Sequence, residues 1–565
     1  MKALSRLLSA LSVLALCLGC SAPDTDAGDS PDGDDGSPVC TEGCETGIQL
    51  SPEQARRVCE TSETGPRTLR RLTSFEVRAT LQDIFPELGA AWNTKLSVDI
   101  SSKLGFSNDS ATLVVGGSTA KEMLKTAEDV GDLITANGVF STILPCADAS
   151  ADAACATEFI NARGLRLFRR PLTDEEVSRY VTYQQSVADR ADFATGIKWA
   201  TVALVQSPHA FYRRELGDQD GSTYKLSQYE LATELGYVYS GSTPDADLLA
   251  AAAAGELATP EQLRAQATRL STSHPRRLEP MSSFFFQWLQ YGKVRGQSRV
   301  KEPTFAESIS LKMLDETNLF LNTVVYGDNG GVRQLMTANY TALDPALSTF
   351  YGFGDVAEGG FARVERPANQ GVGILAQGSM LAATSHQEAT SPTLRGLLFY
   401  TRFLCNSRPK PPDIVPPIEE APGVTEAKTT RQKFEEHHAR GTCASCHKPF
   451  EPFGFTMEQF DETGRYRAME ITPGGDQPIN TVATVTLNDG STPVLTSLDD
   501  VSNLVDSNDD IENCMSGLLA AYAFSGAGGQ YCLAEPERKK LASGELSIRE
   551  FLIELTQAPH FSSRR

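Results

Sequence analysis

The chain has 565 residues, of which 40% are hydrophobic and 22% are charged. This length corresponds to about three or four domains of ordinary size, and the composition excludes a disordered, collagen-like or miniprotein class. Lys and Arg number 51 against 72 Asp and Glu, which gives a net charge of −21, and the sequence contains no basic run. A nucleic-acid binder needs a basic surface to displace the counterions of the phosphates, so the charge balance excludes that class.

The N-terminus has the features of an export signal. Lys2 and Arg6 precede an apolar stretch over residues 7–18, which is too short to span a bilayer and is typical of a secretory signal peptide over residues 1–19. Cys20 follows the signal directly, and residues 16–20 are similar to the lipobox of bacterial lipoproteins, whose cysteine is acylated and becomes the first residue. Asp, Gly, Ser, Pro and Ala dominate residues 21–39, so residues 20–60 are predicted to be a lipid-anchored, acidic, flexible tether. We therefore expect an exported lipoprotein of the bacterial cell envelope, on its periplasmic side or surface; an ordinary cleaved signal is the alternative.

Cysteine usage agrees with export. Of the 12 cysteines, one leaves with the signal peptide, Cys20 takes the lipid, and two belong to a C-x-x-C-H motif at residues 443–447. The remaining eight are an even number, which predicts up to four disulfides in an oxidising compartment. Short separation in the sequence favours the pairs Cys146–Cys155 and Cys514–Cys532. The pairing of the other four is left open; they are Cys40, Cys44, Cys59 and Cys405.

Helical signals dominate the rest of the chain. Three capping boxes, in which Ser or Thr is followed three residues later by Glu, precede apolar residues at helical spacing. They begin at Thr73, Thr173 and Ser227. Further helices are predicted at residues 248–257, 281–291 and 311–325. Prolines predict an extended connector over residues 408–422, and the alternation at residues 482–487, followed by Asn488-Asp489-Gly490, predicts a small hairpin.

One motif carries chemistry, the sequence Cys443-Ala444-Ser445-Cys446-His447. Its C-x-x-C-H spacing is the attachment signature of c-type haem. Two thiols three residues apart reach the two vinyl groups of one porphyrin, and the adjacent histidine ligates the iron. A zinc site needs about four ligands, usually with a second Cys/His pair, and no second C-x-x-C is present. The sequence therefore predicts covalently attached c-type haem, with a zinc site and a thiol–disulfide redox pair as alternatives.

The second axial ligand of the iron is less determined. Met457 or His437 is the candidate sixth ligand; a thioether gives a higher reduction potential than a second imidazole. A buried core methionine and a surface histidine are the structural alternatives, and His386 is a further candidate. The carbonyl of Pro449 or Pro452 is expected to accept a hydrogen bond from the other nitrogen of the proximal histidine and so fix its tautomer.

Residues 443–467 resemble the cytochrome-c-like segment of large exported proteins of planctomycetes and myxobacteria. Those proteins consist of adjoining domains of unknown function with the numbers 1587, 1595, 1592, 1588 and 1585. Other stretches resemble the same set in the same order; they lie around Arg70-Arg71-Leu72-Thr73, Phe168-Arg169-Arg170-Pro171, Ser207-Pro208-His209, Ser385-His386 and Pro559-His560-Phe561. The resemblance implies a bacterial exported c-type cytochrome and does not imply a reaction.

The expected architecture is a mainly α, multidomain helical protein with a C-terminal cytochrome-c-like haem segment and a small β-hairpin. After the tether, the expected domains cover residues 61–140, 141–215, 216–355, 356–470 (the haem domain, with the connector) and 471–565. Electron transfer at the cell envelope is the expected function, with a redox partner protein or a small-molecule electron donor or acceptor as partner. Two alternatives stay open: a haem-dependent oxidoreductase, peroxidase-like or acting on a substrate bound by the helical region, and a non-catalytic binding or scaffold lipoprotein. The sequence assigns no catalytic residue.

Overall fold

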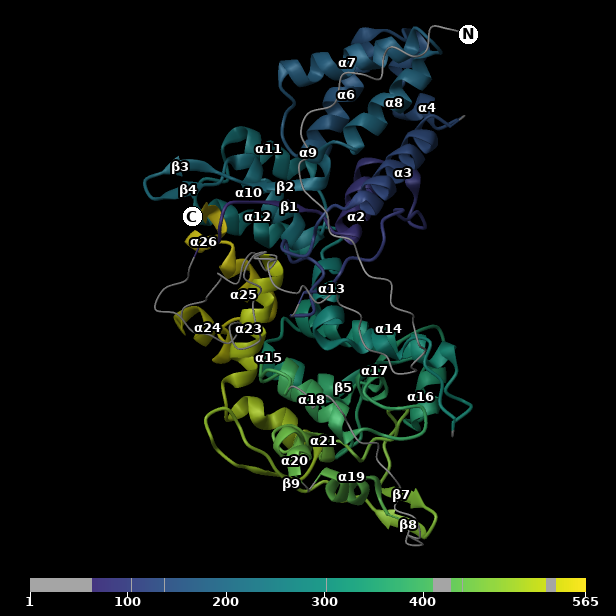
Figure 1. The fold of residues 1–565 in the computed structure, drawn as a ribbon, viewed down its shortest axis with the longest axis vertical. Coiled ribbons are helices and arrows are strands. Elements are labelled where there is room, and N and C mark those ends of the chain that lie inside the picture. The colour runs from purple at the N-terminus through teal and green to yellow at the C-terminus, as the bar shows by residue number, and fades with distance from the viewer. Residues whose placement is uncertain are drawn as a thin grey trace, which may run out of the picture. The chain divides into compact units, whose positions relative to one another are not determined.

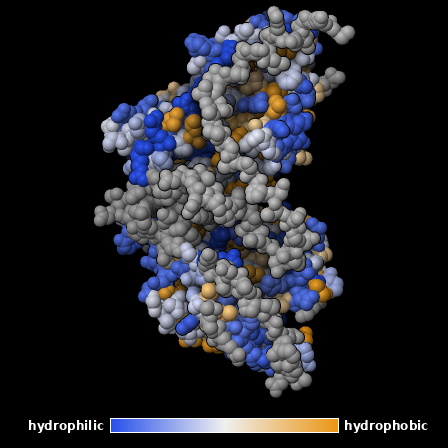
Figure 2. All heavy atoms as spheres, viewed as in Figure 1, coloured by the Kyte–Doolittle hydropathy of each residue, from blue (hydrophilic) through white to orange (hydrophobic). Residues whose placement is uncertain are grey.

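The computed structural model describes residues 64–565, with gaps at residues 103, 137, 301, 410–427, 439–440 and 525–534. These residues belong to one compact unit and are mainly helical, as predicted (Figure 1). Among them, none of the helices combines the length and the apolar character needed to cross a membrane. On the face shown in Figure 2, hydrophilic residues cover most of the described surface, with small hydrophobic patches between them. The signal peptide, the lipid site at Cys20, the tether and most of the proline-rich connector lie outside the described residues.

The N-terminal part of the described chain packs helices around a core of its own. Its elements are β1 (Thr68–Arg71), α2 (Ser74–Ile84), α3 (Gly117–Ile134), α4 (Phe140–Ile143), α5 (Cys146–Ala149), α6 (Ala153–Phe168), α7 (Asp174–Ala188), α8 (Phe193–Val205), α9 (Pro208–Phe211) and β2 (Tyr212–Glu215). The predicted capping boxes at Thr73 and Thr173 open α2 and α7. Val77, Leu81 and Ile84 of α2 share a buried cluster with side chains of α3, α6 and α8. This cluster forms because each of these helices is apolar along one side only.

The middle of the chain adds a second, larger core. Its elements are β3 (Asp218–Asp220), β4 (Thr223–Lys225), α10 (Gln228–Ser240), α11 (Ala246–Ala254), α12 (Pro260–Ser273), α13 (Glu279–Leu289), α14 (Glu307–Asn322), α15 (Val332–Thr337), β5 (Tyr340–Leu343), α16 (Pro345–Tyr351), β6 (Ala362–Glu365), α17 (Gly378–Ala383) and α18 (Pro392–Arg402). The helices predicted at residues 248–257, 281–291 and 311–325 are confirmed as α11, α13 and α14. In the core, Trp288 of α13 lies 5.5 Å from Phe284 and 5.2 Å from Phe403, measured between ring centroids.

The C-terminal part contributes to the same larger core. Its elements are α19 (Thr430–His438), α20 (Gly441–His447), α21 (Glu451–Phe455), β7 (Met469–Thr472), β8 (Gly475–Pro478), β9 (Ala483–Thr484), β10 (Val494–Leu495), α22 (Leu498–Ser502), α23 (Asp510–Ala523), α24 (Glu535–Ala542), α25 (Ile548–Leu555), α26 (Pro559–Ser562) and β11 (Ser563–Arg564). The predicted hairpin is confirmed as β9 and β10, which pair antiparallel around a turn where Gly490 has a φ of +85°.

Small antiparallel sheets join segments that are far apart in the sequence. Strand β1 pairs with β2, in the register Thr68 to Glu215 and Arg71 to Tyr212. The last strand, β11, pairs with β4, which also pairs with β3. The C-terminus is thereby fixed beside the end of β2.

A buried network of charges lies where these strands meet. The Glu215 carboxylate pairs with Arg70 at 2.7 Å and with Arg564 at 2.8 Å, and all three side chains are at most 2% exposed. Glu234 of α10 pairs with the same Arg70 at 3.0 Å and with Arg213 at 2.5 Å. Burial alone raises the pKa of Glu215, but the guanidinium groups of Arg70, Arg564 and Arg213 outweigh burial and lower that pKa to about 2. Glu215 is therefore ionised at neutral pH, whereas burial and the nearby Glu215 charge raise the pKa of Glu234 above its ordinary value. The network joins β1, β2, α10 and β11.

The disulfides correct one of the two predicted pairs. Cys146–Cys155 is confirmed, with a Cα–Cα distance of 5.7 Å. The prediction of Cys514–Cys532 is wrong, because Cys514 is bonded to Cys405, 109 residues earlier. The reason is packing between α18 and α23. Sγ of Cys514, on the buried α23, lies 3.2 Å from the carbonyl oxygen of Arg402, the last residue of α18, and Cys405 follows three residues later. Cys532 lies outside the described residues, as do Cys40, Cys44 and Cys59.

The buried side chain of His560 is expected to make the folded protein less stable in mild acid. Its side chain is 1% exposed, and burial together with the nearby Arg564 lowers its pKa to about 4, whereas an unfolded chain has a histidine pKa of about 6.5. Between these values the unfolded state binds a proton that the folded state does not, so stability falls as the pH drops from 6.5 towards 4. From pH 7 to pH 5 we expect this group to remove about 2 kcal/mol from the free energy of unfolding.

Urea unfolding at pH 7 and pH 5 measures this effect. The variant His560→Gln cannot bind the proton and should lose less stability than the wild type over the same interval. The exposed His386 is the matched control, and His386→Gln should keep the wild-type pH dependence. Equal acid sensitivity of His560→Gln and the wild type would show that another group is responsible.

Candidate metal centre at the C-x-x-C-H motif

The C-x-x-C-H motif forms the short helix α20, which packs against α19. Figure 1 shows α19, α20 and α21 close together in the same part of the molecule. Cys443 and Cys446 are half-buried and carry thiols, with no disulfide between them. His447 ends α20, and its side chain is 25% exposed. The structure thus brings together the three residues that the sequence assigned to haem attachment.

Glu451, the first residue of α21, is the centre of a polar cluster around His447. Its carboxylate accepts hydrogen bonds from Nδ1 of His438 at 2.8 Å and from the Thr393 hydroxyl at 2.6 Å. Nδ1 of His447 lies 3.4 Å from Oε1 of the same carboxylate. The imidazole rings of His438 and His447 stack, with 3.6 Å between their centroids. Glu451 is therefore the group that both histidines share.

The charge of Glu451 follows from these contacts. Burial by itself raises the pKa of this carboxyl group, but the hydrogen bonds from His438 and Thr393 and the nearby imidazole of His447 outweigh burial, so its pKa lies below the ordinary value. The group is a carboxylate at neutral pH and is only 4% exposed. An unpaired buried charge is costly. The Glu451 carboxylate therefore favours the tautomers of His438 and His447 that carry a proton on Nδ1, the nitrogen that faces it.

This arrangement changes the predicted second contact of the proximal histidine. The expected acceptor was the carbonyl of Pro449 or Pro452, but Nδ1 of His447 makes no hydrogen bond within the described residues, and Oε1 of Glu451 lies 3.4 Å from it. The cause is local: the backbone N–H of Phe450 donates to the carbonyl of His447 at 3.2 Å, and this turn returns the chain so that Glu451, the first residue of α21, lies near the ring.

The candidate sixth ligands lie in different environments. Met457 is 3% exposed and belongs to the large hydrophobic core, and its backbone carbonyl accepts a hydrogen bond from Arg395 at 2.8 Å. His437 is half-buried beside His438, with 4.9 Å between the ring centroids, and its Nδ1 is buried without a hydrogen-bond partner in the described part of the chain. His386 is exposed. The assignment of Met457 or His437 stays a prediction.

Two residues of the cluster were missed by sequence reasoning, His438 and Glu451. Together with His447 they place their ligand atoms within 4.8 Å of one another. Two imidazoles and one carboxylate are a donor set typical of zinc and of non-haem iron. The spacing of four residues between His447 and Glu451 was a signal that sequence reasoning did not use, whereas nothing local distinguishes His438 from its neighbour His437.

The residues present fit a c-type haem in their chemistry. Two thiols stand three residues apart on one helix, and an imidazole follows directly. The carboxylate of Glu451, 3.4 Å from Nδ1 of this imidazole, is the kind of acceptor that usually orients a ligating histidine. The same imidazole of His447 belongs to the His438–Glu451 set, so haem and a bare metal ion are competing occupants of this centre.

Comparisons with protein families match four segments of the chain, each described as a protein of unknown function. They are DUF1587 over residues 70–136, DUF1595 over residues 155–215, DUF1592 over residues 226–353 and DUF1588 over residues 371–470. The last model has the short name PSCyt3, which points to a cytochrome, and it spans the whole cluster around His447. Number 1585, expected at the C-terminus, is not among these four. No curated protein and no solved structure matches the chain.

Proposed function

We propose that this chain, which belongs to the planctomycete-type family of cytochrome-like proteins with adjoining domains 1587, 1595, 1592 and 1588, is a single-haem c-type cytochrome that transfers electrons. The observation that carries the proposal is the C-x-x-C-H helix, with thiols at Cys443 and Cys446 and with a buried carboxylate at the proximal histidine. When bound, the haem would supply an iron centre that gains and loses one electron.

The residues of the chain would have distinct roles. Cys443 and Cys446 would form the two thioethers, and His447 would present Nε2 to the iron. Glu451 would accept the Nδ1 proton of His447, which fixes the tautomer and makes the imidazole a stronger donor. His438 would hold Glu451 in place through its hydrogen bond of 2.8 Å. The unpartnered Nδ1 of His437 supports this residue as sixth ligand, and the place of Met457 in the core supports a packing role for the thioether.

The location of the protein is part of the proposal. The signal sequence and Cys20 support export and a lipid anchor at the bacterial cell envelope. There the protein would exchange electrons with a redox partner protein or a small-molecule donor or acceptor. A haem-dependent oxidoreductase and a scaffold lipoprotein are the other functions for such a chain. High-spin iron that binds carbon monoxide would support the oxidoreductase, and low-spin iron with six ligands supports the electron carrier.

A second candidate is a mononuclear metal site. The observation in its favour is the convergence of His438, His447 and Glu451 within 4.8 Å. Such a site does not require Cys443 and Cys446 to form thioethers. The two candidates therefore differ in whether these cysteines are covalently bonded to a haem.

Expression with the c-type haem maturation machinery tests both candidates. We expect a red protein whose haem stays attached through acid–acetone extraction and denaturing electrophoresis. Cys446→Ser and Cys443→Ser should each lose at least one thioether, and Cys146→Ser, which removes a cysteine of the short disulfide, should keep the haem. A folded, colourless wild type that carries one equivalent of zinc or iron would reject the haem and support the second candidate.

A further inference from the structure

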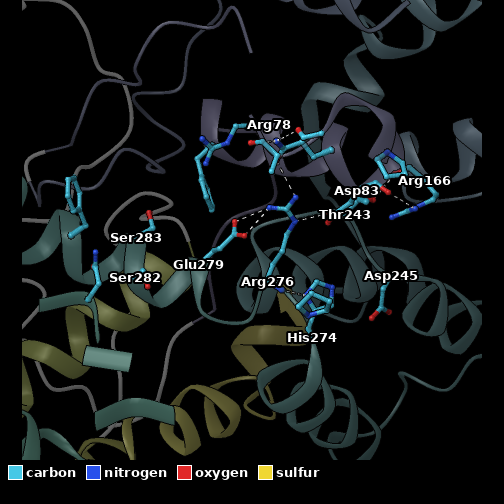
Figure 3. A pocket seen from close by; sticks show the side chains of 18 residues that line it. Arg78, Asp83, Arg166, Thr243, Asp245, His274, Arg276, Glu279, Ser282 and Ser283 are labelled. Carbon is cyan, nitrogen blue, oxygen red and sulfur yellow. Dashed lines mark hydrogen bonds and ion pairs between the residues drawn. The ribbon is translucent and has the colours of Figure 1, made fainter. Parts of the chain in front are cut away.

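A cavity of about 910 Å³ lies far along the chain from the haem motif, and three of the four matched domains line it. Its walls come from α2, from Arg166 of α6, from the segment before α11, and from the end of α12 through α13 (Figure 3). A cavity of this size suits an organic ligand of about two or three sugar rings. None of its lining residues belongs to the cluster around His447.

The carboxylates of this cavity already have cationic partners. Arg276 donates to Asp83 at 2.7 Å and to Glu279 at 3.0 Å, and Figure 3 shows it between these two acids. Asp245 pairs with Arg269 at 2.7 Å and accepts the backbone N–H of Leu248 at the start of α11. The acids therefore leave little negative charge for a cationic ligand.

Two arginines of the same cavity, Arg78 and Arg166, are placed differently. No carboxylate of the described residues lies within 4.0 Å of either guanidinium group. Nη1 of Arg166 donates to the backbone carbonyl of Asp83 at 2.9 Å. The Nε atoms of both arginines are buried without a hydrogen-bond partner in the described chain, so a ligand in the cavity would reach these side chains through their Nη groups. Guanidinium groups with unused donors bind carboxylates and other oxyanions in a two-pronged manner.

Aromatic rings and a neutral imidazole complete the lining. Phe286 lines the cavity and is 40% exposed, so part of its ring is accessible to a ligand. The ring packs against Gly292. A side chain at position 292 would collide with it, because a Cβ atom there would lie 2.1 Å from the ring. Nδ1 of His274 accepts the backbone N–H of Arg276 at 3.1 Å, and burial lowers the pKa of His274, so a neutral ring has its proton on Nε2 as a further donor. An exposed ring beside hydrogen-bond donors is the combination that binds the apolar face and the hydroxyl groups of a sugar.

We propose that this cavity binds an acidic oligosaccharide, whose carboxylates pair with Arg78 and Arg166 and whose sugar ring lies against Phe286. The proposal is independent of the haem, because no residue of the motif takes part in it.

Calorimetric titration of the full-length chain with digalacturonate, neutral galactobiose and inorganic phosphate tests the proposal. We expect digalacturonate to bind more tightly than either other probe, and its affinity to fall with added salt. Arg78→Ala should weaken digalacturonate binding about tenfold, the scale of one charge-assisted contact. Phe286→Ala should weaken it as well, whereas Arg179→Ala, on the exposed side of α7, should leave it unchanged.

Each other outcome overturns a defined part of the proposal. Equal affinity for galactobiose would reject the role of the arginines, and equal affinity for phosphate would reject the sugar. Absence of binding by a folded chain would reject the site. Because Arg166 also holds the backbone of Asp83, the deciding variants are Arg78→Ala and the milder Arg78→Gln, each checked for a wild-type melting temperature.

Discussion

Replacing Glu215 with alanine is expected to lower the free energy of unfolding by about 3–5 kcal/mol, the cost of breaking a buried ion pair by removing one partner. Glu215 accepts from Arg564 and pairs with Arg70, and the three side chains are at most 2% exposed. Without the carboxylate, Arg70 keeps only Glu234, which Arg213 already shares, and Arg564 keeps backbone carbonyls as acceptors but has no carboxylate to balance its buried charge. Urea unfolding at pH 7, followed by circular dichroism, measures the difference.

A matched control is available in β6. Glu365 ends a four-residue strand as Glu215 does, but its side chain is exposed and has no ion pair in the described part of the chain. Glu365→Ala should change stability by less than about 0.5 kcal/mol. If the two variants were equally stable, the buried network would contribute nothing to holding β11 beside β2.

Much of the secondary structure could be predicted because its signals are local. A capping box such as Thr73 with Glu76 satisfies backbone N–H groups within one turn, so the start of α2 depends on neighbouring residues alone. The β9–β10 hairpin is set by its turn residues in the same way. The buried arginines gave no such signal: Arg70, Arg213 and Arg564 differ from surface arginines only in the partners that the fold brings to them.

In the candidate site, too, the residues with a local sequence signal were predicted and those brought together by tertiary packing were not. Cys443, Cys446 and His447 could be found because the chemistry of the motif requires their spacing. Glu451 and His438 meet at His447 only because α19, α20 and α21 pack together and because Thr393 of α18 donates to the same carboxylate. Contacts between helices depend on tertiary packing, which a single sequence does not display.

The partner of Cys514 was predicted wrongly because it, too, depends on tertiary packing. Cys146–Cys155 spans 9 residues and was predicted from proximity, whereas Cys405–Cys514 spans 109 residues and depends on how α18 and α23 pack. Proximity is a sound guide only when no buried helix brings a distant partner closer. Cys514 lies on such a helix, α23, and the cysteine itself has no exposed surface.

The length of the Cys405–Cys514 loop leads to the other large expected effect. A disulfide restricts the unfolded chain more when it closes a longer loop, and the loop-entropy relation gives about 4.8 kcal/mol for this bond against about 2.7 kcal/mol for Cys146–Cys155. Cys514→Ser should therefore lower the free energy of unfolding by more than Cys146→Ser does. The comparison uses the oxidised protein, with urea unfolding of both variants under the same conditions.

Reduction provides the internal control for this ranking. In the presence of excess dithiothreitol the wild type loses both bonds, so each variant should become nearly as stable as the reduced wild type. Any difference that then remains measures the packing of Cys514 itself, whose buried thiol contacts the Arg402 carbonyl. A Cys514→Ser variant that is no less stable than Cys146→Ser, or whose deficit persists in full under reduction, would show that the packing of α18 and α23, and not the closed loop, stabilises this part of the fold.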